Sequence, residues 1–232
     1  MHMLGRWVAQ IYSHTSWVVG HIINGIYPSY CVECKVLVEA DHVICVLCKK
    51  MIQPIATRTL VEGTHKISVY AASLYDGPLQ KLVRQKNHGG MYSSMQLGRL
   101  VVELVDCERI APDLLVPIPL HWRKKAKRGF NQAEIIGKAV AKKLSIPLVE
   151  CIIRIKDTKP QHELTRLERI ANLEGAFAIN PKYQNTMSDL IKDKHITIID
   201  DQVTSGATIN AMARHFFKYK PARISVISAC RK

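Results

Sequence analysis

Two hydrophobic periods alternate along residues 65–232 of the chain. Short apolar runs bounded by polar or turn-forming residues are typical of buried strands, and they occur at Ile67–Leu74, Leu114–Pro119, Leu148–Ile153, Ile196–Asp200 and Arg223–Ser228. Segments with helical spacing separate them, at Pro78–Arg84, Tyr92–Asp106, Asn131–Leu144, Leu164–Ala171 and Thr208–Tyr219. This alternation predicts an α/β fold, in which helices flank a parallel sheet.

The pattern divides the chain into three zones. Residues 1–27 are moderately apolar, but polar residues interrupt them, so they lack the clean span of a transmembrane segment and the layout of a signal peptide. We expect a small N-terminal helix there, either packed on the body of the protein or presented to a partner. Residues 28–60 carry four cysteines and predict a knuckle, and residues 65–232 form the α/β domain.

Composition adds a strong positive charge to this picture. The 232 residues include 33 Lys and Arg against 19 Asp and Glu, a net charge of +14. Such a charge either keeps a basic surface solvated or attracts nucleic acids and phosphorylated small molecules. Hydrophobic residues make up 47% of the chain, which supports a packed core, and only 6% are aromatic, which favours an aliphatic sheet.

Two Cys-x-x-Cys pairs lie ten residues apart in the knuckle, at Cys31, Cys34, Cys45 and Cys48. Four thiolates at this spacing predict a closed tetrahedral site for structural zinc. The alternatives are four unrelated buried thiols, two disulfides, or His42 replacing one ligand. Cysteines that serve as metal ligands indicate a reducing, cytoplasmic setting. The cysteines without partners in the sequence are expected in the core: Cys107, Cys151 and Cys230.

The segment His195–Thr208 combines a strand, an acidic tip and a small loop. Its apolar run ends in Asp200 and Asp201, and helical spacing begins near Thr208. Two carboxylates suit the paired hydroxyls of a ribose, and the loop offers N–H groups at a helix N-terminus to an anion. We therefore expect a sugar-phosphate site, with these residues around the phosphate: Thr204, Ser205, Gly206, Ala207 and Thr208.

A basic loop is predicted over Leu120–Arg128, after the strand that ends at Pro119. Its cations are Arg123, Lys124, Lys125, Lys127 and Arg128. Gly129 allows backbone angles that other residues resist, and Asn131 can cap the next helix. The loop is either a solvated surface or an anion site. In the second case Arg128 and Gly129 bind a diphosphate, and the other four cations attract nucleic acid beside Trp122, a base-stacking platform.

Four elements occur in a characteristic order. They are the cysteine knuckle, Val116-Pro-Ile-Pro followed by Arg-Gly-Phe-Asn-Gln at 128–132, a Thr-x-x-Gln-x-x-Leu and Arg-x-x-Asn segment within 158–172, and the Asp-Asp loop. The loop resembles the phosphoribosyl-diphosphate (PRPP) motif of type I phosphoribosyltransferases. Over residues 28–232 the chain resembles the ComF (ComFC) competence family, which includes GntX-type proteins. Ser205 stands where this family commonly has Thr and keeps the hydroxyl; Gln202 replaces a usual apolar residue.

The resemblance implies a type I phosphoribosyltransferase-like fold with an N-terminal zinc finger. It implies a role in natural transformation, where the protein handles single-stranded DNA after uptake, beside a helicase-like competence ATPase and other DNA-processing proteins. It also implies PRPP or a nucleotide as ligand, with Mg²⁺ if the site is catalytic, and Asp200 and Asp201 as the catalytic pair. A hood over the substrate maps to about 157–172, with the residues Gln161, Arg166, Arg169 and Asn172.

Three functions stay open at this point. A DNA-handling competence protein with a retained PRPP-type site is favoured, because the net charge and the basic loop fit a polyanion. An active phosphoribosyltransferase with an unidentified acceptor is the second. The third is a protein that docks a competence helicase through its knuckle and N-terminal helix.

Overall fold

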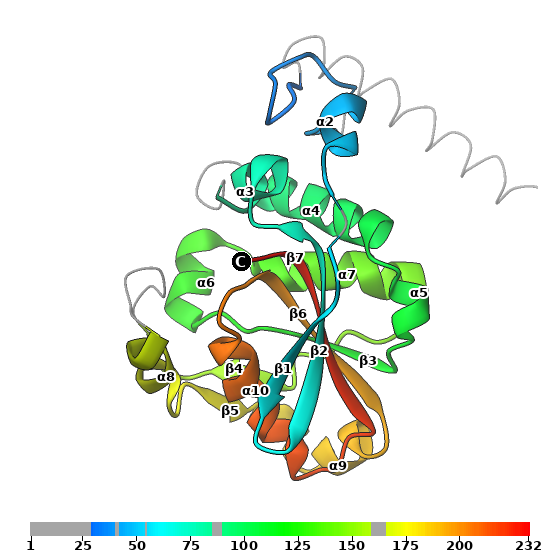
Figure 1. The fold of residues 1–232 in the computed structure, drawn as a ribbon. Helices are drawn as coiled ribbons and strands as arrows, with labels where there is room; N and C mark the ends of the chain where they lie inside the picture. The colour runs from blue at the N-terminus through cyan, green and yellow to red at the C-terminus, as the bar shows by residue number, and fades with distance from the viewer. Residues whose placement is uncertain (1–28, 40–41, 54, 85–89, 159–165) are drawn as a thin grey trace, which may run out of the picture. The chain divides into compact units, whose positions relative to one another are not determined.

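The computed structural model describes residues 29–39, 42–53, 55–84, 90–158 and 166–232, and the fold is drawn in Figure 1. The chain divides into two compact units, Met1–Ile52 and Gln53–Lys232. The N-terminal helix expected over residues 1–27 lies outside the described residues. No helix of the described residues is long and apolar enough to cross a membrane.

A five-stranded sheet forms the centre of the larger unit. Its strands follow the order β1-β2-β7-β6-β3, with these bounds: β1 Arg58–Glu62, β2 His65–Leu74, β7 Arg223–Arg231, β6 His195–Val203 and β3 Leu114–Pro117. The pairs β2–β7, β7–β6 and β6–β3 are parallel, and β1 is antiparallel to β2. The predicted α/β fold with a mostly parallel sheet is confirmed.

Helices α4 (Gly90–Leu104) and α7 (Gln132–Leu144) pack against each other and against strands of this sheet. Gly98 permits this close approach, because a Cβ there would lie 3.0 Å from the Cβ of Ala139. Helix α10 (Ala207–Phe217) packs against α8 (Arg166–Leu173). Short helices complete the unit: α3 Gly77–Arg84, α5 Cys107–Ile110, α6 Trp122–Arg128, α9 Met187–Ile191 and the 3₁₀ turn Pro181–Tyr183.

A second sheet stands apart from the first and consists of β4 (Ile152–Arg154) and β5 (Phe177–Ile179), which are antiparallel. The strand predicted over Leu148–Ile153 as part of the parallel sheet is therefore wrong. Leu148 makes a single bridge to Leu115 of β3, and the chain then leaves to pair with β5. A three-residue partner is too short to recognise from hydrophobic periodicity.

The smaller unit holds the cysteine knuckle. Its chain pairs Tyr30 with Leu37 around a tight turn and continues to helix α2 (Val46–Lys50). The Val32 N–H donates to the Val43 carbonyl at 2.8 Å, which joins the two halves of the knuckle. Strand β1, which belongs to the sheet of the larger unit, begins at Arg58, within the range 28–60 expected for the knuckle.

Candidate functional site

Strand β6 carries the predicted acidic tip. Ile196, Ile198 and Ile199 are fully buried, whereas Asp200 and Asp201 are half-buried. The strand continues to Val203, three residues beyond its predicted end. The Asp201 N–H donates to the Asp200 carboxylate at 2.8 Å. Two carboxylates thus stand at the carboxyl edge of a central parallel strand, where ligands of such sheets bind.

The loop between β6 and α10 turns at Gly206, which has a φ of +84° and directly precedes the first helical residue. A Cβ on Gly206 would lie 2.6 Å from Leu60 Cδ1 of β1, so only glycine fits here without displacement. Ser205 Oγ accepts from the Ala207 N–H at 3.4 Å, and Arg58 donates to the Thr204 carbonyl at 3.2 Å. Strand β1 therefore supports the loop, which leads into the positive end of an 11-residue helix.

The chain that follows β3 leaves the sheet at the same edge. The Ile118 N–H donates to the Ile199 carbonyl at 2.9 Å, directly beside the acidic tip. Asn131 donates from Nδ2 to the Ile118 carbonyl at 2.9 Å and accepts from the Ala133 N–H at 3.2 Å, so it caps α7 as predicted. These contacts bring the two connections together at one edge of the sheet.

The basic segment itself forms helix α6, not the predicted loop. Its sequence, Trp-Arg-Lys-Lys-Ala-Lys-Arg, consists mostly of good helix formers, and Gly129 ends the helix with a φ of +83°. Arg128 is half-buried and has no ion-pair partner within the described residues. The diphosphate role of Arg128 and Gly129 stays a prediction.

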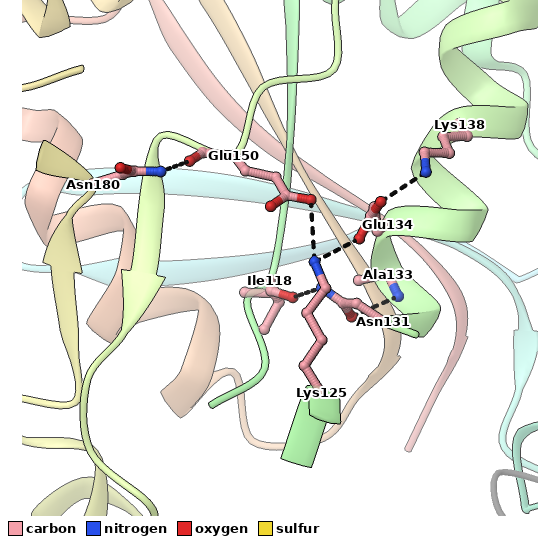
Figure 2. A network of polar contacts seen from close by, with 8 residues as sticks. All are labelled: Ile118, Lys125, Asn131, Ala133, Glu134, Lys138, Glu150 and Asn180. Atoms are coloured by element: carbon pink, nitrogen blue, oxygen red, sulfur yellow. Dashed lines mark hydrogen bonds and ion pairs between the residues drawn. The ribbon is translucent and has the colours of Figure 1, made fainter. Parts of the chain in front are cut away.

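Ion pairs engage two of the α6 cations. Lys124 Nζ donates to the Thr158 carbonyl at 2.7 Å and lies 3.4 Å from Asp157. Lys125 lies 3.1 Å from Glu134 and 3.7 Å from Glu150, in the network of Figure 2. Burial favours a lower pKa for Lys125, but the hydrogen bond to Glu134 and the charge of Glu150 raise its pKa above the ordinary value.

The other α6 side chains face solvent. Trp122 is 64% exposed, and the Arg123 guanidinium lies 5.2 Å from the centroid of its ring. Arg123 and Lys127 are exposed and have no ion-pair partner among the described residues. The nucleic-acid role of these residues stays a prediction. The ion pairs distinguish Lys124 and Lys125, which contact carboxylates, from Arg123 and Lys127, which do not within the described residues.

Sequence reasoning missed Arg154, at the end of β4. Burial lowers the pKa of Arg154, while the charges of Asp200 and Asp157 act to raise it, which places the guanidinium in the field of the acidic tip. It donates to the Thr158 hydroxyl, and it lies 5.5 Å from the centre of the Phe177 ring. No sequence signal distinguishes this arginine, because it stands alone in an isoleucine-rich run.

Gln132, the first residue of α7, is a second missed candidate. It is only 2% exposed, and neither atom of its side-chain amide has a hydrogen-bond partner among the residues that the structure describes. A buried amide without partners is costly, so this position invites a ligand contact. Of the predicted hood residues, Gln161 and the side chains of Arg166 and Arg169 lie outside the described residues, and Asn172 is half-buried.

The four knuckle cysteines form a cluster in which all sulfur atoms lie within 4.8 Å of one another: Cys31, Cys34, Cys45 and Cys48. Zn–S bonds of about 2.3 Å in a tetrahedron require sulfurs about 3.8 Å apart. The Sγ atoms of Cys34 and Cys45 are 3.7 Å apart, and the Cys48 N–H donates to Cys45 Sγ at 3.4 Å. The cluster can therefore hold a metal ion such as zinc, and it fits a zinc knuckle.

The thiols cannot all ionise side by side without a cation. Burial acts to raise the pKa of Cys31, but N–H groups of Cys34, Cys45 and Glu33 outweigh it and hold that pKa at about 6. Burial and the other three thiols raise the pKa of Cys48 to about 12. A divalent metal removes this conflict, because thiolates are the form that binds it. The cysteines expected in the core are buried there: Cys107, Cys151 and Cys230.

The fold and the β6–α10 segment define a phosphoribosyltransferase-like α/β protein, and the phosphoribosyl transferase domain family matches residues 131–232. The DNA utilization protein YhgH of Salmonella typhimurium is 30% identical over 168 residues, which cover 69% of this chain and 70% of that protein. Competence protein F of Haemophilus influenzae is 27% identical over 164 residues, covering 68% and 69%. Competence protein ComFC of Bacillus subtilis is 32% identical over 127 residues, covering 53% and 48%. The chain belongs to the ComF family of competence and DNA utilization proteins.

Proposed function

We propose that this protein handles single-stranded DNA during natural transformation and binds ribose 5-phosphate groups, as in PRPP or a nucleotide, at the edge between β6 and α10. One arrangement carries the sugar-phosphate part of the proposal. Two half-buried carboxylates lie shortly before a loop that turns at Gly206, and the N-terminus of helix α10 follows this loop. The carboxylates match the ribose hydroxyls, and the loop matches the 5′-phosphate.

The DNA part rests on two further observations. Relatives over about 70% of their length are named competence and DNA utilization proteins. The chain has a net charge of +14, and α6 carries five cations and no acid among seven residues. A polyanion is the ligand that such a surface attracts.

The remaining parts of the proposal follow from the cysteine cluster and from the family resemblance. We expect a structural zinc ion in the cysteine cluster, a cytoplasmic setting, and a helicase-like competence ATPase and DNA-processing proteins as partners. Mg²⁺ would accompany the diphosphate of PRPP at the carboxylates. Transfer of the phosphoribosyl group is the second candidate function, favoured by the Arg154 charge beside Asp200.

Calorimetric titration of the full chain tests the sugar-phosphate site. Ribose 5-phosphate and PRPP with Mg²⁺ should both bind, and the Asp201→Asn, Thr208→Ala double variant should weaken both at least about tenfold, or about 1.4 kcal/mol. The matched control is Asp189→Asn, which removes an exposed carboxylate on α9 and should leave both affinities unchanged. Unchanged affinity in the double variant would show that the ligand binds elsewhere.

The same samples separate the candidate functions. Release of diphosphate from PRPP that requires an added acceptor, with the phosphoribosyl group recovered on that acceptor, would establish transfer. Binding of single-stranded oligonucleotides without any PRPP consumption would favour the DNA-handling protein with a retained site. Competition between PRPP and oligonucleotide would show that the two ligands share contacts.

A further inference from the structure

A cavity of about 450 Å³ opens between the end of β3, helix α6 and strand β4. Most of its lining is apolar and comes from Pro117, Pro119, Leu120, Trp122, Ile152, Ile153 and Ile155. The polar lining residues are Lys125, Asn131, Glu150 and Arg154. No residue of the Asp200–Thr208 segment lines the cavity in the described part of the chain, whereas Arg154, which lies in the field of Asp200, does.

Two large apolar side chains stand at the mouth of this cavity. Trp122 is 64% exposed and Ile155 is 56% exposed, although both line the cavity. The ring of the neighbouring His121 is only 4% exposed, whereas the Trp122 indole remains exposed at the same end of α6. Exposed apolar groups around a hollow are typical of a binding site.

The polar part of the lining offers a donor and an acceptor side by side. Lys125 Nζ lies 3.7 Å from Glu150 Oε1, and Figure 2 shows both side chains pointing toward each other from α6 and from the chain before β4. Glu134 holds Lys125 at 3.1 Å from the other side and is itself held by Lys138 at 2.7 Å. The pair is thus fixed in place, as recognition of a flat polar edge requires.

Positive charge lies beside the mouth, where the Arg123 guanidinium is 5.2 Å from the centre of the Trp122 ring and has no ion-pair partner among the described residues. Lys125 lines the cavity and is engaged by Glu134. An occupant should therefore combine a flat apolar body, a polar edge and flanking negative charges, which is the chemistry of a nucleobase within a single strand.

We propose that this cavity receives one unstacked nucleobase of single-stranded DNA, stacked on Trp122 with its polar edge toward Glu150 and Lys125. Arg123, which lies against the Trp122 ring, contacts a flanking phosphate. A carboxylate accepts from an exocyclic amino group, so cytosine is preferred over thymine. This proposal rests on the DNA part of the proposed function.

The test is fluorescence anisotropy of labelled oligonucleotides of equal length with the full chain. A cytosine homopolymer should bind about 10- to 100-fold more tightly than an abasic strand with the same phosphates. Trp122→Ala should remove most of that difference, while Trp122→Phe should keep most of it, because a phenyl ring still stacks. Glu150→Gln should reduce the preference of cytosine over thymine.

Controls keep the outcomes distinct. Val61→Ala, at an exposed apolar residue of β1, should leave DNA affinity unchanged. Ribose 5-phosphate affinity and the melting temperature should be unchanged in Trp122→Ala, which shows that the fold and the other site are intact. Equal affinity for abasic and cytosine strands, or equal affinity of Trp122→Ala and the wild type, overturns the base-binding proposal. Absence of all oligonucleotide binding overturns the DNA part of the proposed function as well.

Discussion

Substitution of Gly206 by alanine tests how the loop before α10 is built. The residue has a φ of +84°, and a side chain in this left-handed region costs about 1–2 kcal/mol. The new Cβ would also lie 2.6 and 2.8 Å from the two methyl carbons of Leu60. Crowding in a packed region typically adds about 1–3 kcal/mol. Together these give a loss of about 2–5 kcal/mol in the free energy of unfolding.

Gly63→Ala is the matched control, because Gly63 has a φ of +59° and a Cβ there meets nothing within 4 Å. This variant should lose only about 1–2 kcal/mol in the free energy of unfolding, which is the cost of a side chain in the left-handed region. The Leu60→Ala, Gly206→Ala double variant should be more stable than the sum of its single variants predicts, by about 1–3 kcal/mol, because the smaller side chain leaves room.

Urea denaturation of each variant measures these differences, and calorimetry measures the affinity for ribose 5-phosphate. Gly206→Ala should weaken that affinity at least about tenfold, since its phosphate loop must shift. If Gly206→Ala and Gly63→Ala destabilise the protein equally and the ligand affinity is unchanged, then Leu60 does not hold the loop in its binding geometry.

Three further predictions concern other parts of the chain. Asn131→Ala should cost about 2–4 kcal/mol in urea denaturation, because it removes a helix cap and leaves the Ile118 carbonyl unpaired. Asn131→Asp should keep the cap but set a buried carboxylate oxygen against that carbonyl, so it should not restore the stability. Burial lowers the pKa of His195, so the folded state stays neutral where the unfolded chain binds a proton. The melting temperature should therefore fall as pH drops below about 6.5, and less so in His195→Gln. Elemental analysis should find about one zinc per chain and none in Cys48→Ser, whose larger unit should keep its unfolding transition.

The elements around the acidic tip were predictable because their pattern is strong. Strand β6 is a run of fully buried isoleucines that ends in two acids, and α10 follows with helical spacing. The cysteine cluster was equally clear, since paired Cys-x-x-Cys motifs close into one site. Both patterns lie within short stretches of sequence, so they can be recognised without knowledge of the rest of the fold.

The parts that escaped prediction depend on contacts between distant segments or on very short elements. The high charge of α6 favours a surface loop in the sequence, but its residues have a strong helix propensity and form a helix. Strand β5 has three residues, too few to show a period. The ion pair of Lys125 depends on Glu150, which is 25 positions away in the sequence. The interaction of Arg154 with Asp200 joins strand β4 of the second sheet to strand β6 of the first, and no local pattern in the sequence indicates it.

The central claim is that the β6–α10 edge binds a ribose 5-phosphate group. A crystal structure of the full chain with ribose 5-phosphate measures this directly. We expect phosphate oxygens within hydrogen-bond distance of backbone N–H groups between Ser205 and Thr208, and ribose hydroxyls at Asp200 and Asp201. A phosphate held by the α6 cations instead, with the loop before α10 empty at saturating ligand, would contradict it.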